Sequence, residues 1–200
     1  MDLSIIISFF ALIISFLTAW FTLFHRGKLR MTQPTIIFFG PDGLSGPPKI
    51  FLRTLLFSTA SKGHIVENMY VNLKRRESTQ NFNIWVYGEK GDLVRGSGLF
   101  VGKEGVACNH HFLLPKDGTS YKFVSGDYSL SIFAQLLGRK KSILLFVQKL
   151  RLSEQFVKEI NDENSGVYFD WGPDSKNYHS HVDRNPNKSL SEFLRKGVLE

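Results

Sequence analysis

The sequence contains a single cysteine, Cys108, among its 200 residues. One thiol cannot form a disulfide within the chain, so the fold cannot depend on the disulfide framework that stabilises many small secreted domains. Reducing compartments tolerate free thiols, whereas oxidising compartments favour disulfides. The lone cysteine therefore agrees with a cytoplasmic location for the folded part of the chain.

The chain also lacks the short motifs that mark several large enzyme classes. It has no Gly-rich loop ending in Gly-Lys-Ser or Gly-Lys-Thr, and no His-Glu-x-x-His pair. Gly96-Ser97-Gly98 lacks the glycine spacing of a nucleophile elbow. These absences favour a binding protein over an enzyme, and no catalytic residue is predicted.

Charge is missing from residues 3–24, a run of 22 mostly apolar residues. A helix of this length is about 33 Å long, enough to cross a hydrocarbon core of about 30 Å. A cleaved signal peptide is the alternative, but it would have a positive start, a shorter apolar run and small residues at a cleavage site. The chain instead begins with Asp2 and has no Lys or Arg before the run. We therefore predict a retained transmembrane anchor over residues 1–25.

Three fixed positive charges follow this run within six residues, at Arg26, Lys28 and Arg30. Lys and Arg beside a membrane span stay on the cytoplasmic side. The sequence thus predicts an N-terminus outside and a cytoplasmic domain, joined by a basic juxtamembrane linker over residues 26–34. Export of the domain is the competing orientation, because a first span does not always obey the charge rule.

Small and hydroxyl-bearing residues recur along one face of the predicted anchor. They are Ser4, Ser8, Ala11, Ser15, Thr18 and Thr22, at spacings of three and four. Such a face lets membrane helices approach closely and hydrogen-bond to each other, which predicts a homo-oligomer formed through the anchor. The alternative is that each hydroxyl bonds back to its own helix.

Short apolar runs separated by turn signals fill residues 35–152. We expect strands at 35–39, 50–59, 64–73, 81–87, 93–101, 106–114, 121–124, 128–137 and 142–152. In the third of these, Ile65, Met69, Val71 and Leu73 should share the core face at period two. No segment between the runs is long enough for a crossover helix, so the predicted fold class is mainly β, an antiparallel β-sandwich.

Residues 153–200 are predicted to form a short helix and an irregular C-terminal tail. Ser153 is the expected N-cap of a helix over 153–160. Residues 161–182 are expected to be irregular. A final helix is expected at 190–196, where Ser189 and Glu192 form a capping box and Gly197 a C-cap.

The segment Ser125-Gly126-Asp127-Tyr128-Ser129-Leu130-Ser131-Ile132 resembles the entry to the penultimate strand of immunoglobulin-like and fibronectin type III sandwiches. The resemblance implies that Tyr128 packs at the strand corner and bonds back to the backbone, with Leu130 and Ile132 facing the core. It also implies that the hairpin ending at Leu152 forms the last two strands. The Cys…Trp…Cys pattern of antibody domains is absent, so the resemblance extends to the fold alone, which hosts many unrelated functions.

Cys108 and His110 share one strand face with Phe112 and Leu114, whereas His111 points the other way with Asn109. A nucleophilic cysteine needs an activating base and an accessible site. The apolar face instead predicts that His110 is a hydrogen-bonded core residue.

The stretch from Asp170 to Asp183 is dense in potential metal ligands. Its candidate ligands are His179, His181, Asp170 and Asp174, a set of histidines and carboxylates that suits zinc or iron. The spacing matches no standard site. The alternative is a tail that packs across the sandwich through its aromatic residues, with hydrated histidines.

Two basic runs, Lys74-Arg75-Arg76 and Arg139-Lys140-Lys141, stand out in a chain of net charge +7. Together with Arg26, Lys28 and Arg30 they predict contact with anionic lipid headgroups. Solvated strand ends that block edge aggregation are the alternative, and nucleic-acid binding is disfavoured because no aromatic-basic motif is present. The function predicted overall is a single-pass, membrane-anchored interaction module for an unidentified protein partner; the alternative is a metal-dependent enzyme or metal sensor.

Overall fold

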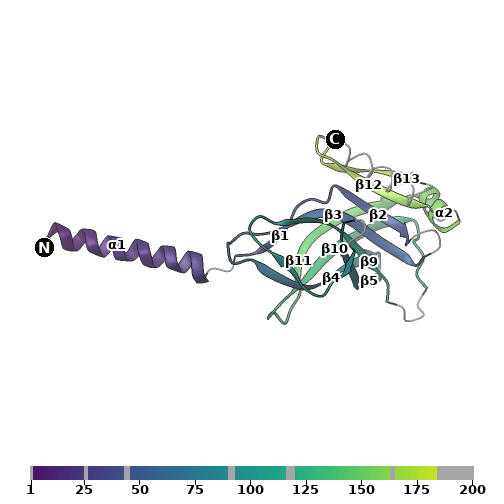
Figure 1. Ribbon diagram of the computed structural model, residues 1–200. Coiled ribbons are helices and arrows are strands. Elements are labelled where there is room, and N and C mark those ends of the chain that lie inside the picture. The colour runs from purple at the N-terminus through teal and green to yellow at the C-terminus, as the bar shows by residue number, and fades with distance from the viewer. Residues whose placement is uncertain are drawn as a thin grey trace, which may run out of the picture.

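The computed structural model describes residues 2–24, 27–42, 46–89, 93–115, 120–162 and 165–183. These residues form two antiparallel sheets, one long N-terminal helix and one short helix (Figure 1). The predicted fold class, mainly β with an antiparallel sandwich, is confirmed. Arg26 and the predicted helix at 190–196 lie outside the described residues.

The first sheet has the order β13-β12-β2-β3-β9-β6-β7, and β1 also pairs with β3. Its strands are β1 (Leu29–Met31), β2 (Ile36–Pro41), β3 (Pro48–Ser58), β6 (Ile84–Gly88), β7 (Val94–Arg95), β9 (Val106–Leu113), β12 (Gly166–Gly172) and β13 (Asn177–Asp183). The second sheet has the order β11-β10-β4-β5, and β8 also pairs with β4. Its strands are β4 (His64–Arg75), β5 (Ser78–Phe82), β8 (Leu99–Val101), β10 (Gly126–Leu136) and β11 (Ile143–Leu152).

Helix α1 (Leu3–Ala19), continued by the π-helical turn η1 (Trp20–Phe24), stands apart from the sheets (Figure 1). None of the residues of α1 is buried, and the helical stretch Leu3–Thr22 is long and apolar enough to cross a membrane. The hydroxyls of Ser8, Ser15 and Thr18 each donate to the carbonyl four residues earlier, at 2.8 Å. These hydroxyls are thus satisfied within their own helix, as the alternative interpretation expects. Oligomerisation through this face stays a prediction.

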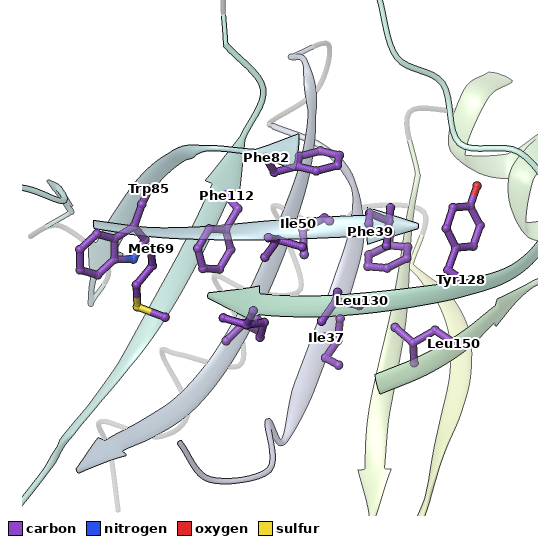
Figure 2. Close-up of a cluster of buried hydrophobic side chains, with 14 of the residues drawn as sticks. Ile37, Phe39, Ile50, Met69, Phe82, Trp85, Phe112, Tyr128, Leu130 and Leu150 are labelled. Carbon is purple, nitrogen blue, oxygen red and sulfur yellow. The ribbon is translucent and has the colours of Figure 1, made fainter. Parts of the chain in front are cut away.

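The hydrophobic core lies between the two sheets, where alternate residues of each strand meet. Figure 2 shows Ile37, Phe39, Ile50 and Phe112 of the first sheet beside Leu130 of the second. All five are 0% exposed. Burying one such side chain contributes roughly 1.5–3 kcal/mol, so this layer provides the main driving force for packing the sheets together.

Tyr128, at the start of β10, anchors the chain that leads into this strand. Its hydroxyl donates to the carbonyl oxygen of Val124 at 2.6 Å and accepts from the Val124 N–H at 3.0 Å. The side chain is 2% exposed. The hydrogen bond back to the backbone that the sequence resemblance implied is confirmed.

The prediction for the start of β4 was wrong by one residue. Ile65 is 41% exposed, whereas its neighbour Val66 is fully buried. The register between β10 and β4 shifts here, because Gln135 pairs with Asn68 and Leu136 with Val66. The extra residue, Glu67, forms a bulge, and a bulge reverses which alternate residues face the core.

Three further strand predictions need correction. Residues 81–87 do not form one strand, since β5 ends at Phe82 in the second sheet and β6 begins at Ile84 in the first. Residues 93–101 do not form one strand, since β7 pairs with β6 in the first sheet and β8 pairs with β4 in the second. Residues 121–124 form no strand, although Phe123 is 2% exposed and stacks on Phe39 at a centroid distance of 5.3 Å. Core burial of its aromatics explains the apolar pattern of this segment without any strand pairing.

The chain after β11 begins with helix α2 (Glu154–Asp162), where the Phe156 N–H donates to Ser153 Oγ at 3.2 Å. The predicted N-cap is confirmed. The expectation of an irregular stretch over 161–182 was wrong, because β12 and β13 form a hairpin there and β12 pairs with β2. This hairpin widens the first sheet beyond residue 152, the predicted end of the strand-rich region.

Candidate functional site

The Asp and His side chains of the β12–β13 strands share one face of the hairpin, and Phe169, Trp171 and Tyr178 lie on the other. Asp170 is opposite His179 in the pairing of the two strands, and His181 is opposite Tyr168. The Asp170 carboxylate lies 3.1 Å from His181 Nδ1, and the His181 ring stacks on Tyr168 at 5.5 Å. Burial raises the pKa of Tyr168, so this phenol stays neutral at physiological pH.

The other two predicted metal ligands do not join this pair. His179 Nε2 lies 3.0 Å from the Ser175 hydroxyl. Asp174 is in the turn between the strands, where a hydrogen bond from the Ser175 backbone N–H lowers the pKa of the Asp174 carboxyl. Within the described parts of the chain, no three His, Cys, Asp or Glu residues are close enough to hold a metal ion. The transition-metal site stays a prediction supported here by one carboxylate–imidazole pair.

Cys108 and His110 lie between the sheets, as their apolar strand face predicted. The Trp85 Nε1–H donates to His110 Nδ1 at 3.1 Å, and His110 Nε2 lies 3.4 Å from Cys108 Sγ. Because indole nitrogen only donates, His110 is the neutral tautomer with its proton on Nε2, directed at the sulfur. Burial lowers the pKa of His110 to about 3 and, as the largest cause, raises that of Cys108 to about 11. Both side chains are therefore uncharged at neutral pH and belong to the packed interior.

The two basic runs lie at opposite ends of the sandwich. Strand β4 begins at His64, which pairs with Val101, and ends at Arg75, which pairs with Ser78. Its twelve residues separate these ends by roughly 36 Å. The run 139–141 is in the β10–β11 turn at the first end, because the Leu137 N–H donates to the Ile65 carbonyl. The run 74–76 is at the second end, so the two runs do not form one surface.

The first end is also where the chain leaves α1, and we call it the anchor end. The Lys28 N–H donates to Thr59 Oγ1 at 2.8 Å, and the Thr59 N–H donates to the Lys28 carbonyl at 3.0 Å. These bonds attach the start of β1, with exposed Lys28 and Arg30, to the turn after β3. The anchor end thus consists of Lys28 and the turns 59–63, 102–105 and 137–142.

The second basic run contributes to a cleft of about 530 Å³. Strand β11 supplies Lys149, Leu150 and Arg151 to its lining, and β13 supplies Asn177, Tyr178 and Ser180. Each of these strands is the last in its sheet, and neither has a second strand partner within the described residues. The cleft therefore lies where the free edges of the two sheets come together.

The cleft has a basic rim and an aromatic floor. Four cationic side chains line it, Lys74, Arg76, Lys149 and Arg151, against one carboxylate, Asp127. Asp127 lies 3.9 Å from Arg151, and both side chains are more than four-fifths exposed, so they neutralise each other only weakly. The excess of positive charge suits an anionic ligand.

The floor of the cleft is fixed in place by buried contacts. Phe169 is 2% exposed and packs edge-on against Phe39 of the core. The Tyr178 hydroxyl donates to the Pro34 carbonyl at 2.7 Å and accepts from Gln33 Nε2 at 2.9 Å. A floor held by such contacts needs little ordering when a ligand binds.

Sequence reasoning predicted Lys74, Arg75 and Arg76 as contact residues but missed Lys149, Arg151, Asn177 and Tyr178. The signal for Lys149 and Arg151 was their alternation with Leu150 and Leu152 along one strand. No local pattern connects this strand with Tyr178, because only the packing of the two sheets brings them together.

No known protein family, curated protein or solved structure matches this chain. The function must therefore be argued from its own geometry.

Proposed function

We propose that this protein is a single-pass membrane protein whose cytoplasmic, immunoglobulin-like sandwich binds an extended acidic segment of a partner protein. The single observation that carries the binding role is the basic cleft between the free edges of β11 and β13. Helix α1 supplies the anchor.

The immunoglobulin-like assignment is supported by strand order. The orders β2-β3-β9-β6 and β11-β10-β4-β5 correspond to A-B-E-D and G-F-C-C′ of immunoglobulin sandwiches. Tyr128 at the start of β10, the F-strand equivalent, makes the corner hydrogen bonds of that architecture. Such sandwiches commonly serve binding, although the fold alone names no partner.

The cytoplasmic orientation is supported by the charges that follow α1. Arg26, Lys28 and Arg30 come after the apolar run, whereas Asp2 precedes it. Green fluorescent protein fused to the C-terminus should fluoresce in cells, and alkaline phosphatase fused there should be inactive, because the positive flank stays in the cytoplasm. An active phosphatase fusion would reverse the orientation.

An extended segment fits the cleft because a free strand edge offers unpaired backbone groups. A peptide added to β11 would gain main-chain hydrogen bonds, as in other complexes formed by strand addition. Acidic side chains at alternate positions of the peptide would meet Lys149 and Arg151, which alternate along the same strand. Complementary charge sets which segment binds and in which register.

The test uses the full chain in detergent micelles and a fluorescent peptide of about ten residues that alternates Glu and Val, which is long enough to cover one strand. We expect the peptide to bind, with an affinity that falls as salt is raised. The triple substitution Lys74→Glu, Lys149→Glu, Arg151→Glu should weaken binding at least about tenfold, a loss of roughly 1.4 kcal/mol.

The matched control reverses three charges at the anchor end, Arg139→Glu, Lys140→Glu and Lys141→Glu, and should bind the peptide as the parent does. Equal binding by both triple variants would disprove the cleft as the site. The alternative is that these Lys and Arg side chains only prevent the strand edges of two molecules from pairing. In that case the cleft variant will aggregate, and the unsubstituted protein will not bind the peptide either.

A further inference from the structure

The anchor end is held close to the point where α1 would leave a membrane. Residue 24 ends the helical segment, and the backbone of Lys28 is hydrogen-bonded to Thr59. Four residue steps span at most about 14 Å, even when the chain is fully extended. The turns beside Lys28 are therefore within a short distance of the headgroups whenever α1 spans a bilayer.

The charge of this end is strongly positive. Its exposed cations are Lys28, Lys62, Lys103, Arg139, Lys140 and Lys141, and Glu104 is its one carboxylate. They come from four segments that are distant in sequence but joined by strand pairing and backbone hydrogen bonds. Ser58 donates to the Gly102 carbonyl, and Leu137 donates to that of Ile65.

Apolar side chains are exposed among these cations. Phe100 is 60% exposed, Leu137 is 55% exposed and Ile65 is 41% exposed. All three line a shallow hollow of about 190 Å³ together with Lys62 and Arg139. Phe100 lies over Gly63, where a side chain would collide with its ring, so the backbone of this turn leaves room for the exposed ring. Exposed apolar groups ringed by cations are typical of surfaces that lie in a membrane interface.

We infer that the anchor end docks on the anionic cytoplasmic leaflet, with Phe100 and Leu137 inserted among the headgroups and the surrounding Lys and Arg side chains on lipid phosphates. This inference rests on the proposed anchoring by α1, and it fixes which end of the domain faces the membrane. The anchor end should bind the bilayer rather than another partner, because α1 holds this surface next to the lipid headgroups. The basic cleft, whose cations lie at the opposite end of β4, then points toward the cytoplasm.

The test places one fluorophore at each end of the full chain, reconstituted in lipid vesicles. Ser61→Cys labels the anchor end and Ser78→Cys labels the opposite end; both positions are exposed, and the native Cys108 is buried. Quenching by nitroxide-bearing lipids reports proximity to the bilayer. We expect label 61 to be quenched about twofold more in phosphatidylcholine vesicles containing about 30% phosphatidylserine than in phosphatidylcholine alone, while label 78 stays unquenched in both.

The triple variant Arg139→Glu, Lys140→Glu, Lys141→Glu should remove the increase at label 61, whereas Lys74→Glu, Lys149→Glu, Arg151→Glu should retain it. Equal quenching of label 61 in both lipid mixtures, or an increase that survives reversal of 139–141, would overturn the docking inference. The peptide-binding assay uses the same two variants with their roles exchanged: there the cleft variant is the test and the 139–141 variant is the control. Failure of membrane docking and failure of peptide binding therefore give different results. An unchanged thermal unfolding temperature excludes misfolding of the anchor-end variant as the cause.

Discussion

At the scale of single residues, the Tyr128 hydroxyl contributes to stability through two hydrogen bonds to the backbone. It is both donor and acceptor to the backbone of Val124, four residues earlier. This reciprocal pair fixes the path by which the chain enters β10, the central strand between β4 and β11. Removing it deprives the Val124 N–H and carbonyl of the hydrogen bonds they make to Tyr128.

We expect Tyr128→Phe to lower the free energy of unfolding by about 1–3 kcal/mol, because two hydrogen bonds are lost and the ring stays. Urea unfolding followed by tryptophan fluorescence measures this change. Tyr70→Phe is the matched control, since Tyr70 stacks on Phe133 on the outer face of the same sheet and should change stability by less than about 0.5 kcal/mol. Equal losses in the two variants would contradict the role given to Tyr128.

His110 makes stability depend on pH. Its folded-state pKa is about 3, lowered by burial from 6.5. Between pH 6.5 and about 3, His110 is protonated in the unfolded chain but neutral in the folded chain. The free energy of unfolding should therefore fall by up to about 1.4 kcal/mol per pH unit as pH drops through this range. His111, whose pKa burial lowers to about 4, adds to the same slope.

The substitution His110→Gln should reduce this slope by about 1.4 kcal/mol per pH unit, because glutamine keeps an acceptor for the Trp85 N–H and carries no titrating group. Unfolding measured from pH 7 down to pH 4 tests the prediction. A slope unchanged in His110→Gln would contradict the assignment.

Residue-level features were predictable from sequence where the determinant is local. Alternation along 106–114 identified His110 as buried, and a short motif identified the hydrogen bonding of Tyr128. Ile65 was predicted wrongly because its exposure depends on a bulge in the pairing of β4 with β10, two strands that are far apart in the chain. Period-two reasoning carries no information about such a register shift.

At the scale of elements, the junction between β2 and β12 depends on glycine. Phe38 lies on the outer face of the first sheet, 3% exposed, in contact with Tyr168 at a centroid distance of 4.8 Å. A Cβ at Gly166 would lie 1.8 Å from the Phe38 ring. Only a residue without a side chain lets β12 approach the ring this closely.

Gly166→Ala should therefore destabilise the fold by about 1–3 kcal/mol, the usual cost of forcing extra atoms into a packed site. The loss should be concentrated in the β12–β13 hairpin, where faster hydrogen exchange of the amides in 167–171 would reveal it. Gly138→Ala is the control for steric collision, since nothing lies within 4 Å of its Cβ position. Its φ of +76° means that any loss of stability there comes from backbone strain. The double variant Gly166→Ala with Phe38→Leu should recover part of the stability if ring contact is the cause. No recovery would point away from it.

Two of the misassigned elements depend on partners that lie far away in the chain. Strand β12 is rich in aromatic residues and pairs with β2, more than a hundred residues earlier. Segment 93–101 was predicted as one strand, yet it contributes strands to both sheets. In contrast, β4, β10 and β11 have long alternating patterns and were located to within one or two residues at most ends.

At the scale of the whole molecule, α1 and the sandwich are separable. No residue of α1 is buried, and none of the core residues belongs to α1. Deleting residues 2–24 should therefore release the protein from membranes while its far-ultraviolet circular dichroism keeps a β spectrum. Cell fractionation and spectroscopy of the purified fragment measure the two outcomes. A fragment that stays with membranes would show that α1 is dispensable for anchoring.

The candidate cleft belongs to this largest scale. Its cations come from β4, the turn after β4 and β11, and its floor comes from β10, β12 and β13. The sequence marked one basic run as a contact site but assigned it to the membrane, because a run of charges shows neither which end of the domain it occupies nor which strand edge lies beside it. That information exists only after the two sheets are stacked.

The attachment of β1 has a mechanical consequence. The chain from α1 enters β1 and then β2, and both pair antiparallel with β3 along nearly their whole length. A partner pulling on the far end would load these strands along their own direction, so the hydrogen bonds of each ladder would resist together instead of opening one at a time. Stretching single molecules between the N-terminus and β11 should therefore show a high rupture force.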